Sequence, residues 1–181
     1  MKKIGKTELD VEQGDITKST TDAIVNAANV SLLGGGGVDG AIHRAAGPEL
    51  LEYCRKLGGC ETGEAKITPG FNLPARYVIH TPGPVWAKSK EAQCDELLRN
   101  SYYNSLRLAD ENKCRSVAFP SISTGVYRFP LDRAAAIVAK TFVEYFTGRP
   151  ETCVERVVMV CFDQKTFEAY EKAFDAIDDS K

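Results

Sequence analysis

Short apolar segments alternate with longer amphipathic segments along most of this chain. The short segments are rich in β-branched residues, which is typical of buried strands; they are residues 7–12, 22–26, 65–68, 77–80, 116–119 and 156–160. The longer segments repeat their apolar positions every three or four residues, as Leu98, Tyr102 and Leu106 do, and so predict helices. These helices are residues 41–46, 91–112, 131–146 and 164–178. The alternation predicts a layered α/β domain with a mostly parallel sheet.

The composition is that of one globular domain. The chain has 181 residues, of which 43% are hydrophobic and 27% charged, enough for a substantial core. Its net charge of −2 argues against a protein that coats nucleic acid, which usually carries a basic face. No apolar run approaches the roughly 20 residues of a membrane helix, and the first residues lack the apolar core of a signal peptide. We therefore expect a single domain over residues 1–181, monomeric, cytoplasmic and without membrane attachment.

Cysteine and histidine are too dispersed to suggest redox or metal chemistry. The six cysteines, at positions 54, 60, 94, 114, 153 and 161, include no CxxC pair. We interpret them as free thiols of a cytosolic protein. With only His43 and His80 beside them, a structural zinc site has few ligands, so we expect no metal and no cofactor.

Polar and glycine-rich segments directly follow five of the predicted strands. These segments are residues 14–17, 26–29, 81–84, 120–125 and 162–163. An open α/β sheet builds its ligand crevice at the carboxyl ends of its strands. The sequence therefore predicts one ligand site at that edge of the sheet.

Four consecutive glycines, Gly34 to Gly37, form the most unusual loop of the chain. A loop without side chains exposes backbone N–H groups, and the helix that follows adds the favourable end of its dipole, so this segment is typical of an anion site. Asp39 would repel a phosphate there, which indicates that the site also handles a water molecule or a hydroxyl. Neither a GxxxxGK[ST] loop nor a GxGxxG motif is present to explain the glycines.

A second loop of small and hydroxylated residues, 121–127, can form the opposite wall of a diphosphate site. Serine, threonine and glycine are also common in ordinary strand-to-helix turns, and the loop alone does not separate the two interpretations. Asn26 and Asn29 either bind ribose hydroxyls or satisfy the backbone of a turn. Asp15 either accepts a hydrogen bond from the exocyclic amine of a base or caps a turn.

Two further side chains have alternative roles. His43 lies four residues after Asp39 on the predicted helix, where it either orients that carboxylate, transfers a proton, or simply packs. Phe162 follows the last predicted strand and either stacks on a base or belongs to the core.

Taken together and in order, these segments resemble the macrodomain family, and its MacroD-type branch in particular. The similarity extends from about residue 12 to residue 163. It rests on residues 14–17 (GDIT), 24–29 (IVNAAN), 34–43 (GGGGVDGAIH), 62–64 (TGE), 80–84 (HTPGP) and 120–127 (PSISTGVY). One departure is Arg128, which stands where the branch usually has glycine and which puts the preference for targets in doubt.

The resemblance implies a three-layer α/β/α fold with a central mixed, mostly parallel sheet that binds ADP-ribose. MacroD-type members remove ADP-ribose from acidic side chains of proteins and deacetylate O-acetyl-ADP-ribose, without a metal. The implied partners are therefore ADP-ribose, O-acetyl-ADP-ribose and ADP-ribosylated proteins, and nucleic acid is not indicated. A module that binds ADP-ribose without turning it over is the alternative.

The resemblance also assigns roles by position. Asp15, Ile16 and Phe162 would hold the adenine, and Asn29 and Asp39 would lie at the distal ribose. Asp39 would activate a water molecule together with the substrate phosphate, and its pairing with Asn29 favours catalysis over mere binding. The implied ligand-binding residues are Asp15, Ile16, Asn26, Gly35, Gly36, Gly37, Val38, Ser121, Ile122, Ser123, Thr124, Gly125, Val126, Tyr127 and Phe162, and the implied catalytic residues are Asn29, Asp39 and His43.

Overall fold

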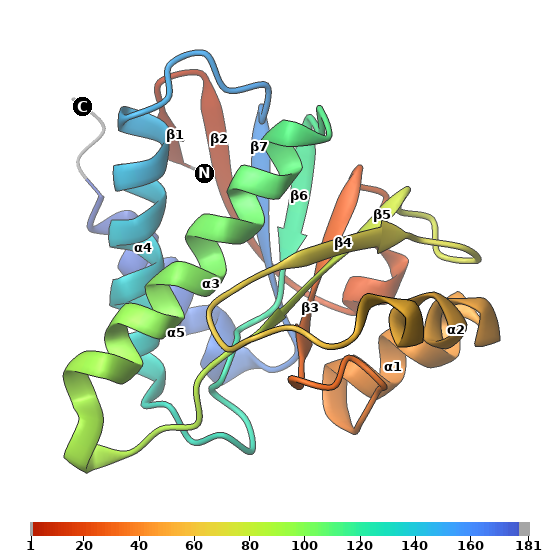
Figure 1. Cartoon of the computed structure of the whole chain (residues 1–181). Coiled ribbons are helices and arrows are strands. Elements are labelled where there is room, and N and C mark those ends of the chain that lie inside the picture. Colours follow the sequence, from red (N-terminus) through yellow and green to blue (C-terminus); the bar gives the residue numbers. More distant parts are fainter. Residues whose placement is uncertain (1, 178–181) are drawn as a thin grey trace.

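The computed structural model describes residues 2–177, which form one mixed sheet between two layers of helices (Figure 1). Within this range the sheet has the order β1-β2-β7-β6-β3-β5-β4. The inner pairings, β2 with β7, β7 with β6, β6 with β3 and β3 with β5, are parallel, and the outer strands β1 and β4 are antiparallel to their neighbours. The strands are β1 (Lys2–Ile4), β2 (Thr7–Gln13), β3 (Ala23–Ala28), β4 (Lys66–Pro69), β5 (Tyr77–Pro82), β6 (Ser116–Phe119) and β7 (Arg156–Cys161). The prediction of a mixed, mostly parallel sheet is confirmed.

The helices divide between the two faces of this sheet. Two short 3-10 turns, η1 (Ile16–Lys18) and η2 (Lys88–Lys90), accompany α1 (Gly37–Ala46), α2 (Pro48–Leu57), α3 (Glu91–Glu111), α4 (Leu131–Thr147) and α5 (Gln164–Asp175). Helices α3, α4 and α5 cover one face, and α1 and α2 cover the other (Figure 1). The predicted three-layer α/β/α fold is therefore confirmed, and the predicted end of the last helix at position 178 lies outside the described residues.

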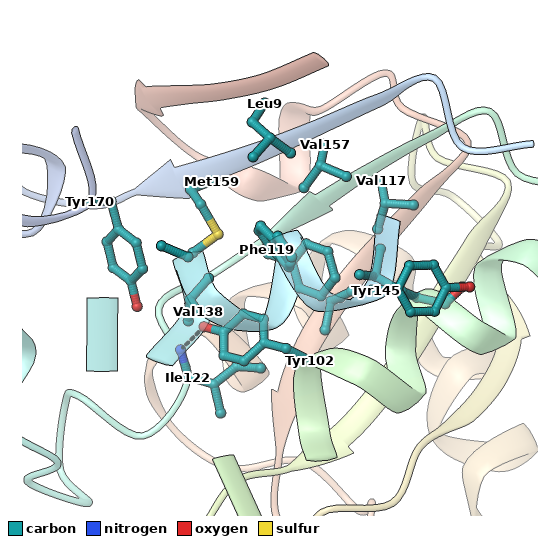
Figure 2. Packing of buried hydrophobic residues seen from close by; sticks show 14 of the residues in the cluster. Leu9, Tyr102, Val117, Phe119, Ile122, Val138, Tyr145, Val157, Met159 and Tyr170 are labelled. Atoms are coloured by element: carbon teal, nitrogen blue, oxygen red, sulfur yellow. Dashed lines mark hydrogen bonds between the residues drawn. The ribbon is translucent and has the colours of Figure 1, made fainter. Parts of the chain in front are cut away.

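Alternation along the strands produces two separate cores. On β6, Val117 and Phe119 belong to the larger cluster under α3, α4 and α5, whereas Ala118 between them belongs to the smaller cluster under α1 and α2. Figure 2 shows the larger cluster, in which the Tyr102 hydroxyl accepts a hydrogen bond from the Ile122 N–H at 2.9 Å. This bond ties the loop after β6 to the core.

Two elements escaped prediction, β1 and α2. Helix α2 is ten residues long and buries only Leu50 and Cys54, too few apolar positions to establish a helical period. Its boundaries carry recognisable signals, because Pro48 occupies the first turn and Gly58 ends the helix in the left-handed conformation at φ 71°. Strand β1 is three residues long and pairs only with β2.

Among the predicted boundaries that are wrong, two change the positions of Asn26 and Asp39. Strand β3 runs to Ala28 rather than ending at Asn26, so Asn26 lies inside a strand and not in the loop after it. Helix α1 starts at Gly37 rather than at Ala41, so Asp39 lies in its first turn. Glycines weaken a helix by propensity, but only its first turn contains them here.

Candidate functional site

The polar segments that follow the strands lie along one edge of the sheet. Gly14 follows β2, and its N–H donates to the carbonyl of Cys161 at the end of β7 at 2.9 Å. Ala28 and Pro82, the last residues of β3 and β5, are register partners. These contacts give the loops after the parallel strands a common rim, as open α/β sheets require for a ligand crevice.

Asp39 and Asn29 face each other across Gly35. A Cβ added to Gly35 would lie 3.3 Å from Asp39 Oδ2 and 3.5 Å from Asn29 Nδ2. Gly35 therefore leaves space next to both a carboxylate and an amide. Asn29 also satisfies its own turn, because its Nδ2 donates to the Gly34 carbonyl at 2.9 Å and its Oδ1 accepts from Ser31 and Leu32. The turn role predicted as an alternative for Asn29 is thus present, and it fixes the amide beside Asp39.

Asp39 lies in the first turn of α1 and is buried, with 5% of the residue exposed. Burial raises the pKa of Asp39 above its ordinary value, and hydrogen bonding from Asn26 and the charge of His43 oppose this rise. Burial is the largest of these three contributions, so the pKa of Asp39 is raised although the other two lower it. Such a group is a better base than an exposed aspartate.

Asn26 does not lie where the sequence placed it. Its side chain is fully buried below Asp39, and its Nδ2 donates to Asp39 Oδ1 at 2.9 Å and lies 3.1 Å from His80 Nδ1. The predicted contact of Asn26 with ribose hydroxyls is therefore wrong, because Asn26 is an interior residue of β3 with no exposed surface. Its hydrogen bond instead orients the carboxylate of Asp39.

His43 lies one helical turn after Asp39. Its Nε2 is 3.5 Å from Asp39 Oδ1 and makes no hydrogen bond to any described residue, although it is buried. The distance is too long for a formed hydrogen bond. The ring also lies against Gly34, where an added Cβ would be 3.6 Å from Cδ2. His43 is thus placed to influence Asp39 and lines the same glycine loop.

The glycine loop presents open backbone to the rim. Gly36 is the N-cap of α1 and has no side-chain cap, and an added Cβ at Gly36 or Gly37 would meet nothing within 4 Å. Among the described residues, the N–H groups of residues 35–38 have no hydrogen-bond acceptor. A helix cannot pair its own first N–H groups, so these donors are available to an anion. An added Cβ at Gly40 would lie 2.5 Å from the Gly35 carbonyl, so Gly40 lets the loop approach the helix.

In the second loop, residues 121–127, the first residues are fixed by hydrogen bonds and the later ones are exposed. Ser121 Oγ contacts Thr124 Oγ1 at 2.7 Å and the hydroxyl of Tyr170 at 2.8 Å. Ser123 is buried in the left-handed conformation at φ 68°. Gly125 is exposed, and Val126 is 92% exposed. The open part of the loop therefore consists of residues 124–126.

The predicted contact of Ile122 with the ligand is wrong. Its side chain is fully buried in the larger core, and its N–H is taken by the Tyr102 hydroxyl. Neither group is free for a ligand, so Ile122 anchors the loop. Tyr127, by contrast, is partly exposed, and its carbonyl accepts from the Trp86 N–H at 2.9 Å. Arg128 follows in the left-handed conformation at φ 62°, exposed to solvent.

Asp15 and Phe162 follow the paired strands β2 and β7 at the other end of the rim. Asp15 caps η1, with its Oδ1 accepting from Thr17 N at 3.0 Å and Thr17 Oγ1 at 2.7 Å, and these bonds lower its pKa. The capping role expected as an alternative is thus present, and the carboxylate remains exposed. Phe162 is 90% exposed, so it is not a core residue. Ile16 places its side chain in the smaller core.

His80 belongs to the motif at residues 80–84, but the sequence predicted no role for it. The structure buries its ring completely, between Thr68 and Asn26, and burial lowers its pKa to about 3. The signal available in the sequence was a histidine inside an otherwise apolar strand. Only the pairing of β5 with β3 places it beside Asn26.

The remaining expectations concern metals, thiols and membranes. All six cysteines are free, and five of them are buried. Within residues 2–177 no group of three or more His, Cys, Asp or Glu side chains is arranged to hold a metal ion. In the same range no helix combines the length and the apolar character needed to cross a bilayer.

Known proteins are similar to this chain in sequence and in fold. The model of the Macro domain family matches residues 25–138. A macro domain-containing protein of Lactiplantibacillus plantarum is 61% identical over 170 residues, covering 94% of this chain and 98% of that protein. The O-acetyl-ADP-ribose deacetylase of Escherichia coli is 53% identical over 171 residues, covering 92% of this chain and 95% of that protein.

Solved structures agree with this relationship. The Oceanobacillus iheyensis macrodomain with ADP superimposes with a TM-score of 0.89 at 46% identity, covering 96% of this chain and 93% of that chain. The Trypanosoma brucei macrodomain in complex with ADP-ribose gives a TM-score of 0.84 at 43% identity, covering 91% of this chain and 68% of that chain.

Proposed function

Because this chain belongs to the macrodomain family, we propose that it binds ADP-ribose and hydrolyses esters at its distal ribose. The substrates are O-acetyl-ADP-ribose and proteins that carry mono-ADP-ribose on aspartate or glutamate. The observation that carries this proposal is the buried Asp39 carboxylate facing the Asn29 amide across Gly35, directly beside open N–H groups of the glycine loop.

The rim matches the parts of ADP-ribose in order. Phe162 offers an exposed ring for a base to stack on, and Asp15 offers an exposed carboxylate for its exocyclic amine. The N–H groups of residues 35–38 and the open loop 124–126 offer two walls for a diphosphate. Asn29 and Asp39 then lie beyond the diphosphate, where the distal ribose would be. Relatives whose names or structures mention ADP, ADP-ribose or its acetyl ester support ADP-ribose as the ligand.

The reaction needs a base, a fixed water molecule and a leaving group. Asp39 removes a proton from water as the water oxygen bonds to the acyl carbon. The bond between that carbon and the ribose oxygen then breaks, and the ribose oxygen takes up the proton. The products are the free acid, which is acetate or a protein carboxyl group, and ADP-ribose. The neighbouring substrate phosphate further raises the pKa of Asp39 by like-charge repulsion, which strengthens the base.

Positioning supplies the rest of the acceleration. Asn26 fixes one oxygen of Asp39, and the turn around Asn29 fixes the facing amide. Two rigid loops can then hold ester and water together, which converts the reaction into an effectively unimolecular one. The alternative, a module that binds ADP-ribose without hydrolysis, uses the same loops, and in it Asn29 and Asp39 only clamp the ribose.

The decisive experiment compares wild type with Asp39→Asn, which keeps the shape of the side chain and removes the base. Turnover of O-acetyl-ADP-ribose and of a glutamate-ADP-ribosylated protein is measured beside calorimetric binding of ADP-ribose. We expect turnover to fall about a hundredfold or more while the affinity changes little. Asp175→Asn on the exposed end of α5 is the matched control and should behave as wild type. Tight binding without turnover by the wild type would establish the binding module instead.

A further inference from the structure

A chain of hydrogen bonds between buried polar side chains runs from the outer strand β4 to Asp39 in α1. His80 Nε2 lies 3.0 Å from Thr68 Oγ1, and His80 Nδ1 lies 3.1 Å from Asn26 Nδ2. Asn26 Nδ2 donates in turn to Asp39 Oδ1 at 2.9 Å. Asn26 and His80 are fully buried, and Thr68 is 2% exposed. Four elements, β4, β5, β3 and α1, thus meet through one line of hydrogen bonds.

Asp39 sets the direction of the bonds in this hydrogen-bonded chain, because an ionised carboxylate only accepts and the NH2 group of Asn26 must therefore face it. An amide nitrogen only donates, so His80 Nδ1 is an acceptor and carries no proton. The proton of the neutral ring therefore sits on Nε2, which donates to Thr68 Oγ1. The Thr68 hydroxyl is then free to donate to the Pro69 carbonyl, which lies 3.1 Å away. Burial lowers the pKa of His80 to about 3, so the ring stays neutral at any working pH.

This arrangement leaves one atom without a partner. Asn26 Oδ1 is buried and makes no hydrogen bond to any described residue. Buried unpaired acceptors destabilise a fold, and rotation of the amide is the usual way to relieve them. Rotation here would turn the oxygen toward the ionised carboxylate of Asp39 and toward the unprotonated Nδ1 of His80. Both neighbours repel it, so the two together hold the amide in place.

We propose that His80 is a positioning residue for the hydrolysis proposed above: its Nδ1 holds the Asn26 amide with the NH2 group toward Asp39. This inference rests on the proposed function. As a consequence, the two oxygens of Asp39 have different roles. Oδ1 is held by Asn26, and Oδ2 is the oxygen that lies beside the position of a Gly35 Cβ, next to the glycine loop. The catalytic oxygen is thereby aimed without being hydrogen-bonded itself.

Two substitutions of His80 separate positioning from packing. The side-chain oxygen of His80→Asn can occupy the place of Nδ1 and accept from Asn26. His80→Gln is closer to histidine in size, but its terminal group reaches toward Thr68 and leaves Asn26 without its acceptor. Positioning therefore predicts that the smaller side chain works better. We expect kcat for O-acetyl-ADP-ribose to fall about tenfold in His80→Gln and less in His80→Asn, with KM almost unchanged.

The pH profile gives a second readout that packing alone would not move. Donation from Asn26 lowers the pKa of Asp39, so its loss in His80→Gln should shift the acidic limb of kcat to higher pH. The other groups that face Asp39 are His43 on the same helix and Cys54 on α2, whose thiol stays neutral because burial raises its pKa to about 11. Neither is altered by these variants.

Cys54→Ala is the matched control. Its buried sulfur contacts His80 Nε2 at 4.0 Å, on the nitrogen that faces Thr68, so its removal leaves the contact between His80 Nδ1 and Asn26 in place. The substitution should lower the melting temperature and leave the acidic limb of kcat in place. Thr68→Val removes the hydroxyl that accepts from Nε2 while keeping the shape, and it should lower kcat less than His80→Gln does.

The outcomes distinguish the inference from the function on which it rests. If wild type hydrolyses O-acetyl-ADP-ribose and His80→Gln is as active as His80→Asn with an unshifted acidic limb, His80 only packs. A wild type that binds ADP-ribose without turnover overturns the proposed function itself. The ring can also be observed directly in the free wild-type protein by nitrogen NMR. An unprotonated Nδ1 supports the chain as described, and a proton on Nδ1 overturns it even if His80→Gln fails to fold.

Discussion

The loops after β5 and β6 approach so closely at Gly83 that a single methyl group should disturb the ligand rim. A Cβ added to Gly83 would lie 2.2 Å from Ser123 Oγ and 2.3 Å from Ile122 Cγ2. Atoms of side chains do not approach to such distances, so Gly83→Ala must displace one loop. Gly83 carries no left-handed backbone conformation, and the effect is therefore purely steric.

The two contacts differ in cost. Ser123 Oγ makes no hydrogen bond to any described residue, so its rotation away from the new methyl group is inexpensive. Ile122 cannot yield in the same way, because its side chain is fully buried and its N–H is bound to the Tyr102 hydroxyl (Figure 2). Overpacking of this kind costs about 1–3 kcal/mol, which lowers the melting temperature of a chain of this size by about 2–12 °C.

Thermal unfolding followed by circular dichroism measures the stability, and calorimetry with ADP-ribose measures the consequence for the rim. We expect Gly83→Ala to weaken ADP-ribose binding as well, since the displaced loop includes the open residues 124–126. Gly14→Ala is the control for stability, because a Cβ there meets nothing within 4 Å. Addition of Ser123→Ala should restore only a small part of the lost stability. Unfolding of Gly83→Ala at the wild-type temperature, or full rescue by Ser123→Ala, would refute the role given to Ile122.

Three further predictions address Asp39, Arg128 and Phe162. Burial raises the folded-state pKa of Asp39 above its unfolded value, so ionisation of this group destabilises the fold as the pH rises between the two values. Asp39→Asn should therefore increase the free energy of unfolding by urea at about pH 7. The difference in unfolding free energy between variant and wild type should become smaller below about pH 4, and an equal difference at pH 7 and below pH 4 would contradict this. Arg128→Gly relieves a left-handed backbone at φ 62° and should raise the free energy of unfolding by up to about 1 kcal/mol, measured in the same way, whereas a loss would show that the arginine side chain stabilises the loop. Phe162→Ala should leave the melting temperature unchanged, because the ring is 90% exposed, yet weaken ADP-ribose binding about tenfold through lost stacking; unchanged affinity would exclude a contact with the base.

The sequence was sufficient for the fold because its layers depend on local patterns. β-branched segments and amphipathic helices were separable by period, and the parallel order followed from their alternation. Helix α2 was missed because its ten residues bury only two apolar side chains, Leu50 and Cys54. Strand β1 was missed because three residues cannot show a period, and its pairing with β2 is a tertiary fact.

Only the exposed residues of the site were predictable from the sequence. Glycines, hydroxyls and carboxylates in loops mark a rim by composition alone, and Gly35, Asp39 and Phe162 lie on that rim. Asn26 and Ile122 were assigned to the ligand because they stand beside loop residues in the sequence. Both side chains are buried: Asn26 because β3 continues to Ala28, two residues beyond its predicted end, and Ile122 because it packs into the larger core. Local sequence does not determine such a boundary to that accuracy.

The buried residues of the site explain how an anion site can contain a carboxylate. The glycine loop and the start of α1 attract negative charge, and an exposed aspartate there would compete with the phosphate for it. Asp39 avoids the competition because its Oδ1 already accepts a hydrogen bond from Asn26, so the N–H groups of residues 35–38 remain without an acceptor among residues 2–177. Burial then keeps its pKa raised despite that hydrogen bond. The same buried support that releases the loop for a diphosphate therefore also leaves Oδ2 as a base, and binding and hydrolysis become two properties of one hydrogen-bonded arrangement.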